Sequence, residues 1–228
     1  MAFETLFDKY DRLVLFDTET TGLDFRRDEI IEFAAVVVEN RDGVPTVVEE
    51  YDELIKLTPG TYVPFAIEQL TGISTEDTQD RGLPKAKVAC DISRMFKGNT
   101  LLLAYNAQFD LLFLYYFLLR HGDLTALKGK DKLDLLTVYK DRRPYPHKLH
   151  NAIAAYGLSG KVVNSHRAVD DVLATVEVMK CMEAERDDLC RYINLFGYNP
   201  KYGISGKPIG SITYKPQAFD PVAPLYER

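Results

Sequence analysis

The order of the apolar segments constrains the fold of this 228-residue chain more than any other feature. Three β-branched or apolar runs come first, at residues 12–16, 29–39 and 46–57, and residues 40–43 (Asn-Arg-Asp-Gly) have turn chemistry. Such short connections predict an antiparallel meander. After residue 64, helical patterns alternate with one further apolar run at 100–105. Strands first, and then a strand among helices, predict an α/β domain with a mixed sheet covered by helices.

Helices are predicted where apolar residues recur at helical spacing or where a start signal precedes them. These segments are 64–70, 85–96, 107–120, 135–140, 148–156 and a helix that begins after His166. Pro64 is expected at a first helical position, and Asn106 is placed to cap the helix that follows it. We divide the chain into a domain at 1–197 and a Pro/Gly/Tyr-rich, non-helical C-terminal extension at 198–228.

Composition excludes several classes of protein. The formal net charge of -6 argues against a protein that holds long duplexes with a broad basic surface. Cys90, Cys181 and Cys190 are an odd set without CxxC spacing, which favours reduced thiols over disulfides or a zinc site. The longest apolar run, 111–119, is shorter than the roughly 20 residues that span a bilayer, and no signal peptide pattern opens the sequence. We therefore expect a soluble, cytoplasmic protein without membrane contacts.

Acidic residues gather where the predicted strands end and helices begin. Asp17 and Glu19 follow the first run and are two residues apart, so their side chains project from one face. Asp110 follows the run at 100–105, and Asp171 lies five residues after His166. Taken singly, each has an ordinary explanation as a loop acid, a helix-start acid or a surface histidine, and Asp170 is an alternative to Asp171. Taken together, they indicate a site for hard cations, and phosphodiester hydrolysis is the reaction that most needs two such ions.

Three segments resemble the exonuclease motifs of the DEDDh superfamily, which includes the epsilon proofreading subunit of bacterial replicative polymerases, RNase T and oligoribonuclease. They are residues 17–23 (Asp-Thr-Glu-Thr-Thr-Gly-Leu), 106–110 (Asn-Ala-Gln-Phe-Asp) and 166–171 (His-Arg-Ala-Val-Asp-Asp). The resemblance covers residues 13–182 and implies a ribonuclease-H-like, mixed five-stranded sheet flanked by helices. One departure is Tyr105, because many family members have histidine before the motif asparagine. This difference bears on substrate contacts rather than on the metal positions.

The resemblance also implies roles for individual residues. Two divalent cations, Mg²⁺ or Mn²⁺, would be held by Asp17, Glu19 and Asp171 at one position and by Asp17 with Asp110 at the other. His166 would be the general base that takes a proton from the attacking water, a role that suits imidazole. Four residues become candidates to hold the last nucleotide: Thr18, Leu23, Asn106 and Phe109. Core packing for Leu23 and Phe109, and capping for Asn106, remain the alternatives.

The function that these residues indicate is a metal-dependent 3′-to-5′ exonuclease. It would release nucleoside 5′-monophosphates from single-stranded DNA ends in proofreading or repair, with a DNA polymerase as a candidate partner. The alternatives are an exoribonuclease that trims RNA 3′ ends, since nothing in the sequence decides the sugar, and an inactive exonuclease-fold docking module. A Ser165–His166–Asp hydrolase is disfavoured, because adjacent residues do not reach one another and a GxSxG elbow is missing. The oligomeric state is not predicted.

The extension at 198–228 lies outside the resemblance. Its aromatic and basic residues could support a single strand by stacking and charge, or its tyrosines could simply pack against the domain. The residues in question are Lys201, Tyr202, Lys207, Tyr214 and Lys215.

Overall fold

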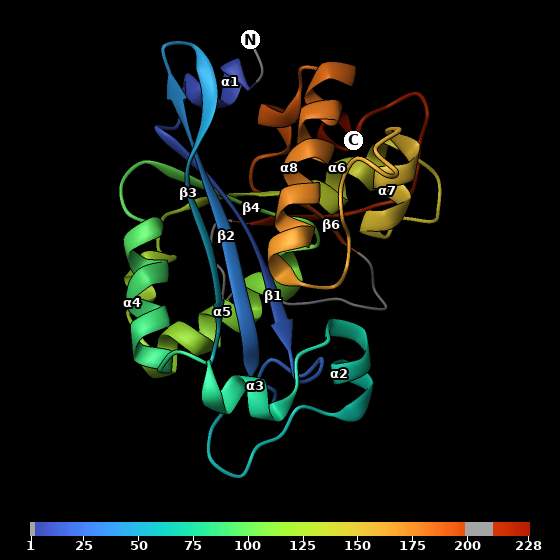
Figure 1. Cartoon of the computed structure of the whole chain (residues 1–228). Coiled ribbons are helices and arrows are strands. Elements are labelled where there is room, and N and C mark those ends of the chain that lie inside the picture. Colours follow the sequence, from blue (N-terminus) through green and yellow to red (C-terminus); the bar gives the residue numbers. More distant parts are fainter. Residues whose placement is uncertain (1–2, 199–211) are drawn as a thin grey trace.

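A computed structural model describes residues 3–198 and 212–228 of the chain. Its centre is a mixed sheet with helices on both faces (Figure 1). The five strands lie in the order β3-β2-β1-β4-β5. The predicted mixed five-stranded sheet flanked by helices is therefore confirmed.

The strands form an antiparallel meander followed by two parallel strands. β1 (Arg12–Thr20), β2 (Ile30–Arg41) and β3 (Val44–Leu54) pair antiparallel, as predicted. β4 (Thr100–Ala104) and β5 (Asp131–Asp134) run parallel to β1. Because parallel strands end at the same edge of a sheet, whatever follows β4 is brought close to the end of β1.

β1 is longer than the sequence predicts. The predicted strand stops at Phe16, but pairing with β2 continues until Thr20 meets Ile30. The acids at 17 and 19 are therefore inside the strand and not in a loop after it. The long partner strand explains the difference, because β2 continues to offer backbone hydrogen bonds where the apolar run of β1 has ended.

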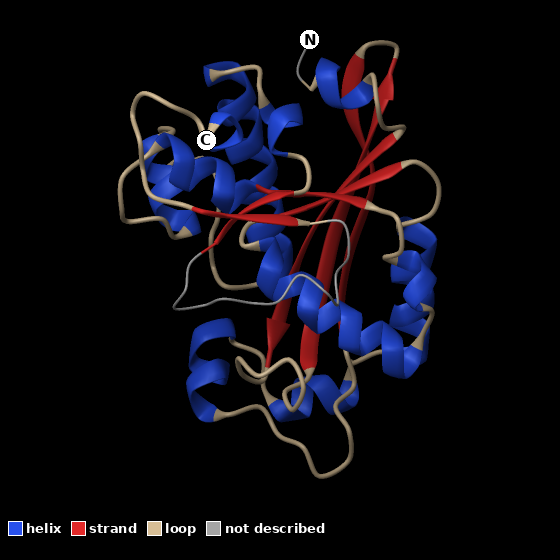
Figure 2. Cartoon of the chain, turned by 180° about the vertical axis from the view of Figure 1, so that it is seen from behind, coloured by secondary structure: helices blue, strands red, loops and turns tan. Residues whose placement is uncertain are grey.

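Two hydrophobic cores lie on the two faces of the sheet. α6 (Leu135–Arg142), α7 (Leu149–Ala155) and α8 (Ala168–Glu185) pack on one face, and α4 (Lys85–Met95) and α5 (Ala107–His121) cover the other (Figures 1 and 2). Side chains alternate between the faces, so Leu13 and Leu15 belong to the α8 core, whereas Val14 and Phe16 belong to the other.

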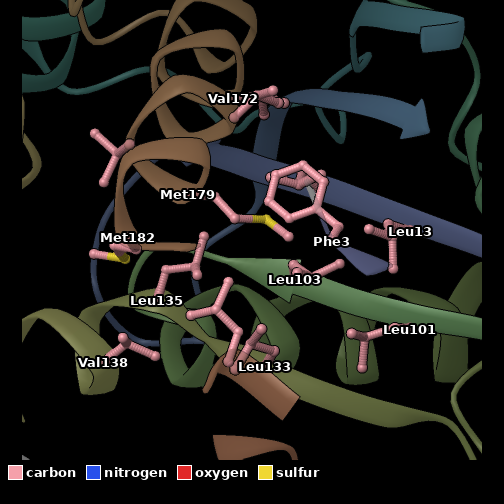
Figure 3. Close-up of a cluster of buried hydrophobic side chains, with 14 of the residues drawn as sticks. Phe3, Leu13, Leu101, Leu103, Leu133, Leu135, Val138, Val172, Met179 and Met182 are labelled. Carbon is pink, nitrogen blue, oxygen red and sulfur yellow. The ribbon is translucent and has the colours of Figure 1, made fainter. Parts of the chain in front are cut away.

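Figure 3 shows the α8 core, in which Met179 of the helix lies close to Leu103 of β4 and Met182 lies near Leu135 of α6. Full burial of one such side chain stabilises the fold by about 1.5–3 kcal/mol. The same alternation that buries Leu13 and Leu15 carries the next residues of that phase, Asp17 and Glu19, to the α8 face.

Most helices agree with the sequence prediction within a few residues. α2 (Phe65–Thr71) begins one residue after Pro64, which is extended and occupies the N-cap, not the first helical position. Two short helices were not predicted, α1 (Glu4–Phe7) and α3 (Thr75–Asp80). α3 begins with a capping box in which Ser74 and Asp77 satisfy each other's backbone N–H groups.

The predicted capping role of Asn106 is wrong. Asn106 precedes α5 in a left-handed conformation (φ 72°), and its side chain makes no capping hydrogen bond. Oδ1 of Asp134 instead accepts hydrogen bonds from the backbone N–H groups of Asn106 (3.1 Å) and Ala107 (3.0 Å). Its Oδ2 accepts from Thr137 N (3.1 Å) in the first turn of α6. One buried carboxyl group thus holds two helix starts, because its two oxygens can accept several hydrogen bonds from backbone donors.

The described part of the C-terminal extension packs onto the domain. β7 (Thr213–Pro216) pairs parallel with β6 (Leu195–Tyr198) in a second, two-stranded sheet. Leu225 is buried, and its backbone N–H donates to Oδ2 of Asp141 in α6 (2.7 Å). Lys201, Tyr202 and Lys207, considered above for strand binding, lie outside the described residues. Among the described helices, none has the length and apolar character needed to cross a membrane.

Candidate active site

Asp17 and Glu19 lie on the α8-facing side of β1, near its C-terminal end. Asp17 pairs with Ala34 of β2 and Glu19 with Glu32, and the regular pairing breaks directly after Glu19. Two acids are thereby fixed on one rigid strand with their side chains on the same face, as the spacing predicted.

Asp171 reaches these two acids from the first turn of α8. Carboxylate oxygens of Asp17, Glu19 and Asp171 lie within 4.8 Å of one another. Oδ1 of Asp171 accepts a hydrogen bond from Nδ2 of Asn164 (2.6 Å), which orients the carboxylate. A strand and a helix start that are more than 150 residues apart in the sequence thus supply one acidic cluster.

Asp110 lies beside this cluster without being part of it. Its side chain projects from the first turn of α5 and is 2% exposed. Oδ1 accepts hydrogen bonds from the backbone N (3.0 Å) and Oγ1 (2.7 Å) of Thr18, the residue between the two strand acids. Burial raises the pKa of Asp17, and the negative charge of Asp110 raises it further.

The electrostatics of the acids are those of a site that favours cations. Burial, and then the surrounding carboxylates, raise the pKa of Asp17 well above its ordinary value. Burial and the charge of Asp171 raise the pKa of Glu19 to about 8, and burial raises the pKa of Asp110 to about 7 against the hydrogen bonds from Thr18. Such crowding is relieved either by protons or by bound cations. The cluster offers only oxygen ligands, so the residues fit hard divalent ions such as Mg²⁺ or Mn²⁺.

His166 lies at the rim of the acidic cluster. Its side chain is exposed, and its backbone is left-handed (φ 59°), a conformation that histidine tolerates better than most residues. Burial raises the pKa of Asp171, and the nearby His166 opposes that rise. An imidazole that is both near the acids and open to solvent can exchange protons with water.

Ser165 and Asp170 are paired with each other. The Ser165 hydroxyl donates to Oδ2 of Asp170, not to His166. In the part of the chain that the structure describes, no serine–histidine hydrogen bond supports the alternative Ser165–His166–Asp hydrolase. Asp170 is held at this surface pair, while Asp171 faces Asp17 and Glu19.

The four residues considered for nucleotide binding have different surroundings. Leu23 is 83% exposed, which excludes core packing, and Asn106 makes no capping bond, which excludes its alternative role. Phe109 is partly buried, with its ring centroid 4.8 Å from that of Phe113, so it packs against the core at least in part. Thr18 is buried and bonded to Asp110. The side chains of Leu23 and Asn106 are thus exposed and take part in neither core packing nor capping.

Sequence reasoning missed a buried ion pair that holds the start of α8. Glu32 of β2 is fully buried, and its Oε1 accepts from Nε of Arg167 (2.8 Å). Its Oε2 accepts from the backbone N of Ala168 (2.7 Å), the first residue of α8. The only hint in the sequence was a single glutamate inside the apolar run 30–38. Nothing in the sequence indicated that Asn164 bonds Asp171.

Comparison with known proteins matches the chain to one family model and to DNA polymerase III proteins. The model of the exonuclease family RNase_T matches residues 14–179. The chain is 33% identical over 176 residues to the PolC-type DNA polymerase III of Clostridium perfringens, an alignment that spans 75% of this chain and 11% of that protein. It is 29% identical over 194 residues to DNA polymerase III subunit epsilon of Treponema pallidum, covering 81% of this chain and 83% of that subunit. The chain thus spans about a tenth of the PolC-type relatives that it matches.

Solved structures share the fold. The crystal structure of E. coli Exonuclease I in complex with a dA16 oligonucleotide superposes with a TM-score of 0.69 at 22% sequence identity. The match covers 80% of this chain and 42% of that one. An Exonuclease I from Methylocaldum szegediense gives a TM-score of 0.65 at 23% identity, over 79% of this chain and 42% of that protein.

Proposed function

The chain belongs to the exonuclease family, and from that premise we propose that it hydrolyses single-stranded DNA from the 3′ end and releases nucleoside 5′-monophosphates. The observation that carries this proposal is the approach of Asp17, Glu19 and Asp171 to within 4.8 Å of one another, with Asp110 alongside. Four buried or half-buried acids at one place are costly for a fold unless a cation offsets their repulsion.

In this proposal Asp17, Glu19 and Asp171 hold one divalent cation, and Asp17 and Asp110 hold a second. Mg²⁺ and Mn²⁺ are the ions that such oxygen ligands select. When bound, two such cations polarise the scissile phosphodiester and neutralise charge on the departing 3′ oxygen. Asn164 keeps the Asp171 carboxylate turned toward the strand acids, and Thr18 does the same for Asp110.

His166 takes a proton from the attacking water. Its exposed position at the rim lets it pass that proton on to solvent, and its place directly before Arg167 ties it to the rigid start of α8. Leu23 and Asn106, with Phe109 and the backbone of Thr18, contact the terminal nucleotide. The exposed surface of Leu23 supports this role, because it offers an apolar contact for a base.

DNA is favoured over RNA because the relatives named above are DNA polymerase III proteins and because an Exonuclease I of this fold was crystallised with a DNA oligonucleotide. The same relatives support a DNA polymerase as partner and action in the cytoplasm, in proofreading or repair. An inactive docking module is disfavoured, because such a module has no chemical need for four clustered acids and a histidine.

The test uses 5′-labelled single-stranded DNA and RNA of matched sequence, incubated with the purified protein in Mg²⁺ or Mn²⁺. We expect a ladder that shortens from the 3′ end, faster on DNA, and absent with EDTA or in Asp17→Asn. A faster RNA ladder would assign the protein to RNA trimming. An intact label on both strands under every metal would favour the docking module.

A further inference from the structure

One long stretch of this acidic chain contains no acid. Between Arg142 and Val169 there is no Asp or Glu, although the chain has a formal net charge of -6. The same stretch contains five Lys or Arg residues and three of the four histidines. It runs from the last residue of α6, through α7, to the start of α8, and so includes His166.

The first part of this stretch is bonded to the end of β4, the strand that pairs with β1. β1 and β4 are parallel and pair Leu13 with Leu101 and Leu15 with Leu103. β4 ends at Ala104, and Tyr105 follows it directly, at the sheet edge toward which the parallel strand β1 also runs. The Tyr105 side chain packs with the α8 core, and its hydroxyl donates to the backbone carbonyl of His147 (2.8 Å). The loop 143–148 between α6 and α7 is therefore anchored to the residue that follows β4, the strand next to β1.

The loop 143–148 is held in shape by its own contacts. Nε2 of His147 lies 2.9 Å from the carbonyl oxygen of Arg143, which closes the loop on itself. The His147 ring meets Tyr139 of α6 edge-on at 5.9 Å and the Tyr145 ring at 5.7 Å. A loop fixed in this way presents its outer side chains without a large ordering cost when it binds a ligand.

The outer side chains of the loop are an aromatic ring and a cation. Tyr145 is 85% exposed, the most exposed tyrosine in the described residues. Lys148 is exposed, and among the described residues no carboxylate lies within ion-pair distance of its ammonium group. Arg143 differs, because it is paired with Glu185 (2.6 Å). An exposed ring beside an uncompensated cation is the combination that holds single strands by stacking and charge.

We propose that the loop 143–148 binds the unpaired strand upstream of its 3′ end, with Tyr145 stacking on a base and Lys148 neutralising a phosphate. This proposal rests on the proposed function and adds the path of the substrate to it. The two cations of the proposed site would act only on the scissile phosphodiester, so affinity for the rest of the strand has to come from a neighbouring surface. The acid-free stretch is such a surface, on the same face of the sheet as the acids.

The test is steady-state hydrolysis of an oligothymidylate of about 15 nucleotides, longer than the footprint of one such surface. Tyr145→Ala should raise KM about fivefold or more with kcat unchanged, because one stacked base is lost. Tyr145→Phe keeps the ring and should retain the wild-type KM.

Lys148→Ala should raise KM and lower the slope of log KM against log salt by about 0.7, the value for one phosphate contact on a single strand. Lys97→Ala, an exposed lysine that follows α4 on the opposite face, is the matched control and should change neither.

A second substrate separates this proposal from the proposed function. The p-nitrophenyl ester of thymidine 5′-monophosphate has no upstream strand, so the loop variants should hydrolyse it like wild type. An unchanged oligonucleotide KM in both Tyr145→Ala and Lys148→Ala, or equal losses on the ester, would overturn the role of the loop. If the wild type hydrolyses neither substrate, the proposed function fails. The role of the loop is then tested by binding, measured as the fluorescence anisotropy of a labelled oligothymidylate in Ca²⁺. Weaker oligonucleotide binding by both loop variants than by wild type supports the role of the loop, and affinities equal to that of wild type contradict it.

Discussion

Asp17 is the residue on which the candidate site depends most. It is enclosed by four acids, and burial together with Asp110, Glu19 and Asp171 raises its pKa. Asp17→Asn should abolish hydrolysis and weaken Mn²⁺ binding in isothermal titration, because the proposed ligand shared by both cations is lost. The metal-free variant should be at least as resistant to heat as wild type, since one repelling charge is removed. Turnover near the wild-type rate would exclude the two-cation assignment.

His166 has a different predicted effect, because it holds a proton and not a cation. His166→Ala should slow hydrolysis roughly 10²–10⁴-fold, the usual contribution of a positioned base. Mn²⁺ affinity and oligonucleotide binding should stay near wild type, and the limb of the pH–rate profile that reports the base should disappear. A variant with an unchanged rate and profile would remove His166 from the mechanism.

At this scale the sequence was informative about residues that follow a local rule. Alternation along a strand predicted that Asp17 and Glu19 share a face, and the structure has them so. Glu32, Arg167 and Asn164 were missed because their roles come from tertiary partners. Local sequence does not state which helix start a buried glutamate will meet.

Among the elements, the start of α8 positions the most residues of the candidate site, because its first turn carries Asp171 and His166 directly precedes its N-cap. Glu32→Ala should lower the free energy of unfolding by about 1–3 kcal/mol, since the backbone N–H of Ala168 loses its buried acceptor. Glu32→Gln keeps an acceptor and should lose less. Urea denaturation measures both.

The matched control lies on the same strand. Glu39 pairs with Arg12 (3.0 Å), and both side chains are more than a quarter exposed, so Glu39→Ala should cost less than about 1 kcal/mol. Equal losses for the Glu32 and Glu39 variants would contradict the view that the buried pair fixes the start of α8.

Elements with long apolar patterns were predictable, and short ones were not. The strands of the meander and the helices α4 and α5 have long apolar patterns and were placed within a few residues. The start of α8 was also placed within a few residues, and no end was predicted for it. β5 (Asp-Lys-Leu-Asp) has no apolar run and is a strand because it pairs with β4. The end of β1 was misplaced for a similar reason, since its partner β2 decides where pairing stops.

The metal-free molecule as a whole should become less stable as pH rises. The folded-state pKa of Glu19 is about 8 against an ordinary 4.5, so between these values the folded chain binds more protons than the unfolded chain. Stability from this group is present at low pH and is lost as pH rises toward 8. In EDTA, the thermal midpoint of wild type should therefore fall relative to that of Glu19→Gln between about pH 5 and 8.

Cation binding should reverse this trend. Bound ions displace the protons, so the gain in thermal midpoint on adding Mg²⁺ should grow with pH in wild type. The gain should be smaller in Glu19→Gln than in wild type. Differential scanning fluorimetry across the range measures both effects. Parallel curves for the two proteins in EDTA would show that the Glu19 carboxyl does not carry the predicted shift.

The most direct test of the central claim, that these acids form a cation-dependent exonuclease centre, is the rate of 3′ shortening of a single-stranded oligonucleotide as Mn²⁺ is added back to chelated protein. We predict no shortening without metal, and a rate that rises with about the second power of free Mn²⁺ at limiting concentrations, as two cooperating ions require. Shortening that persists after chelation, or its absence at every Mn²⁺ concentration, would contradict the account.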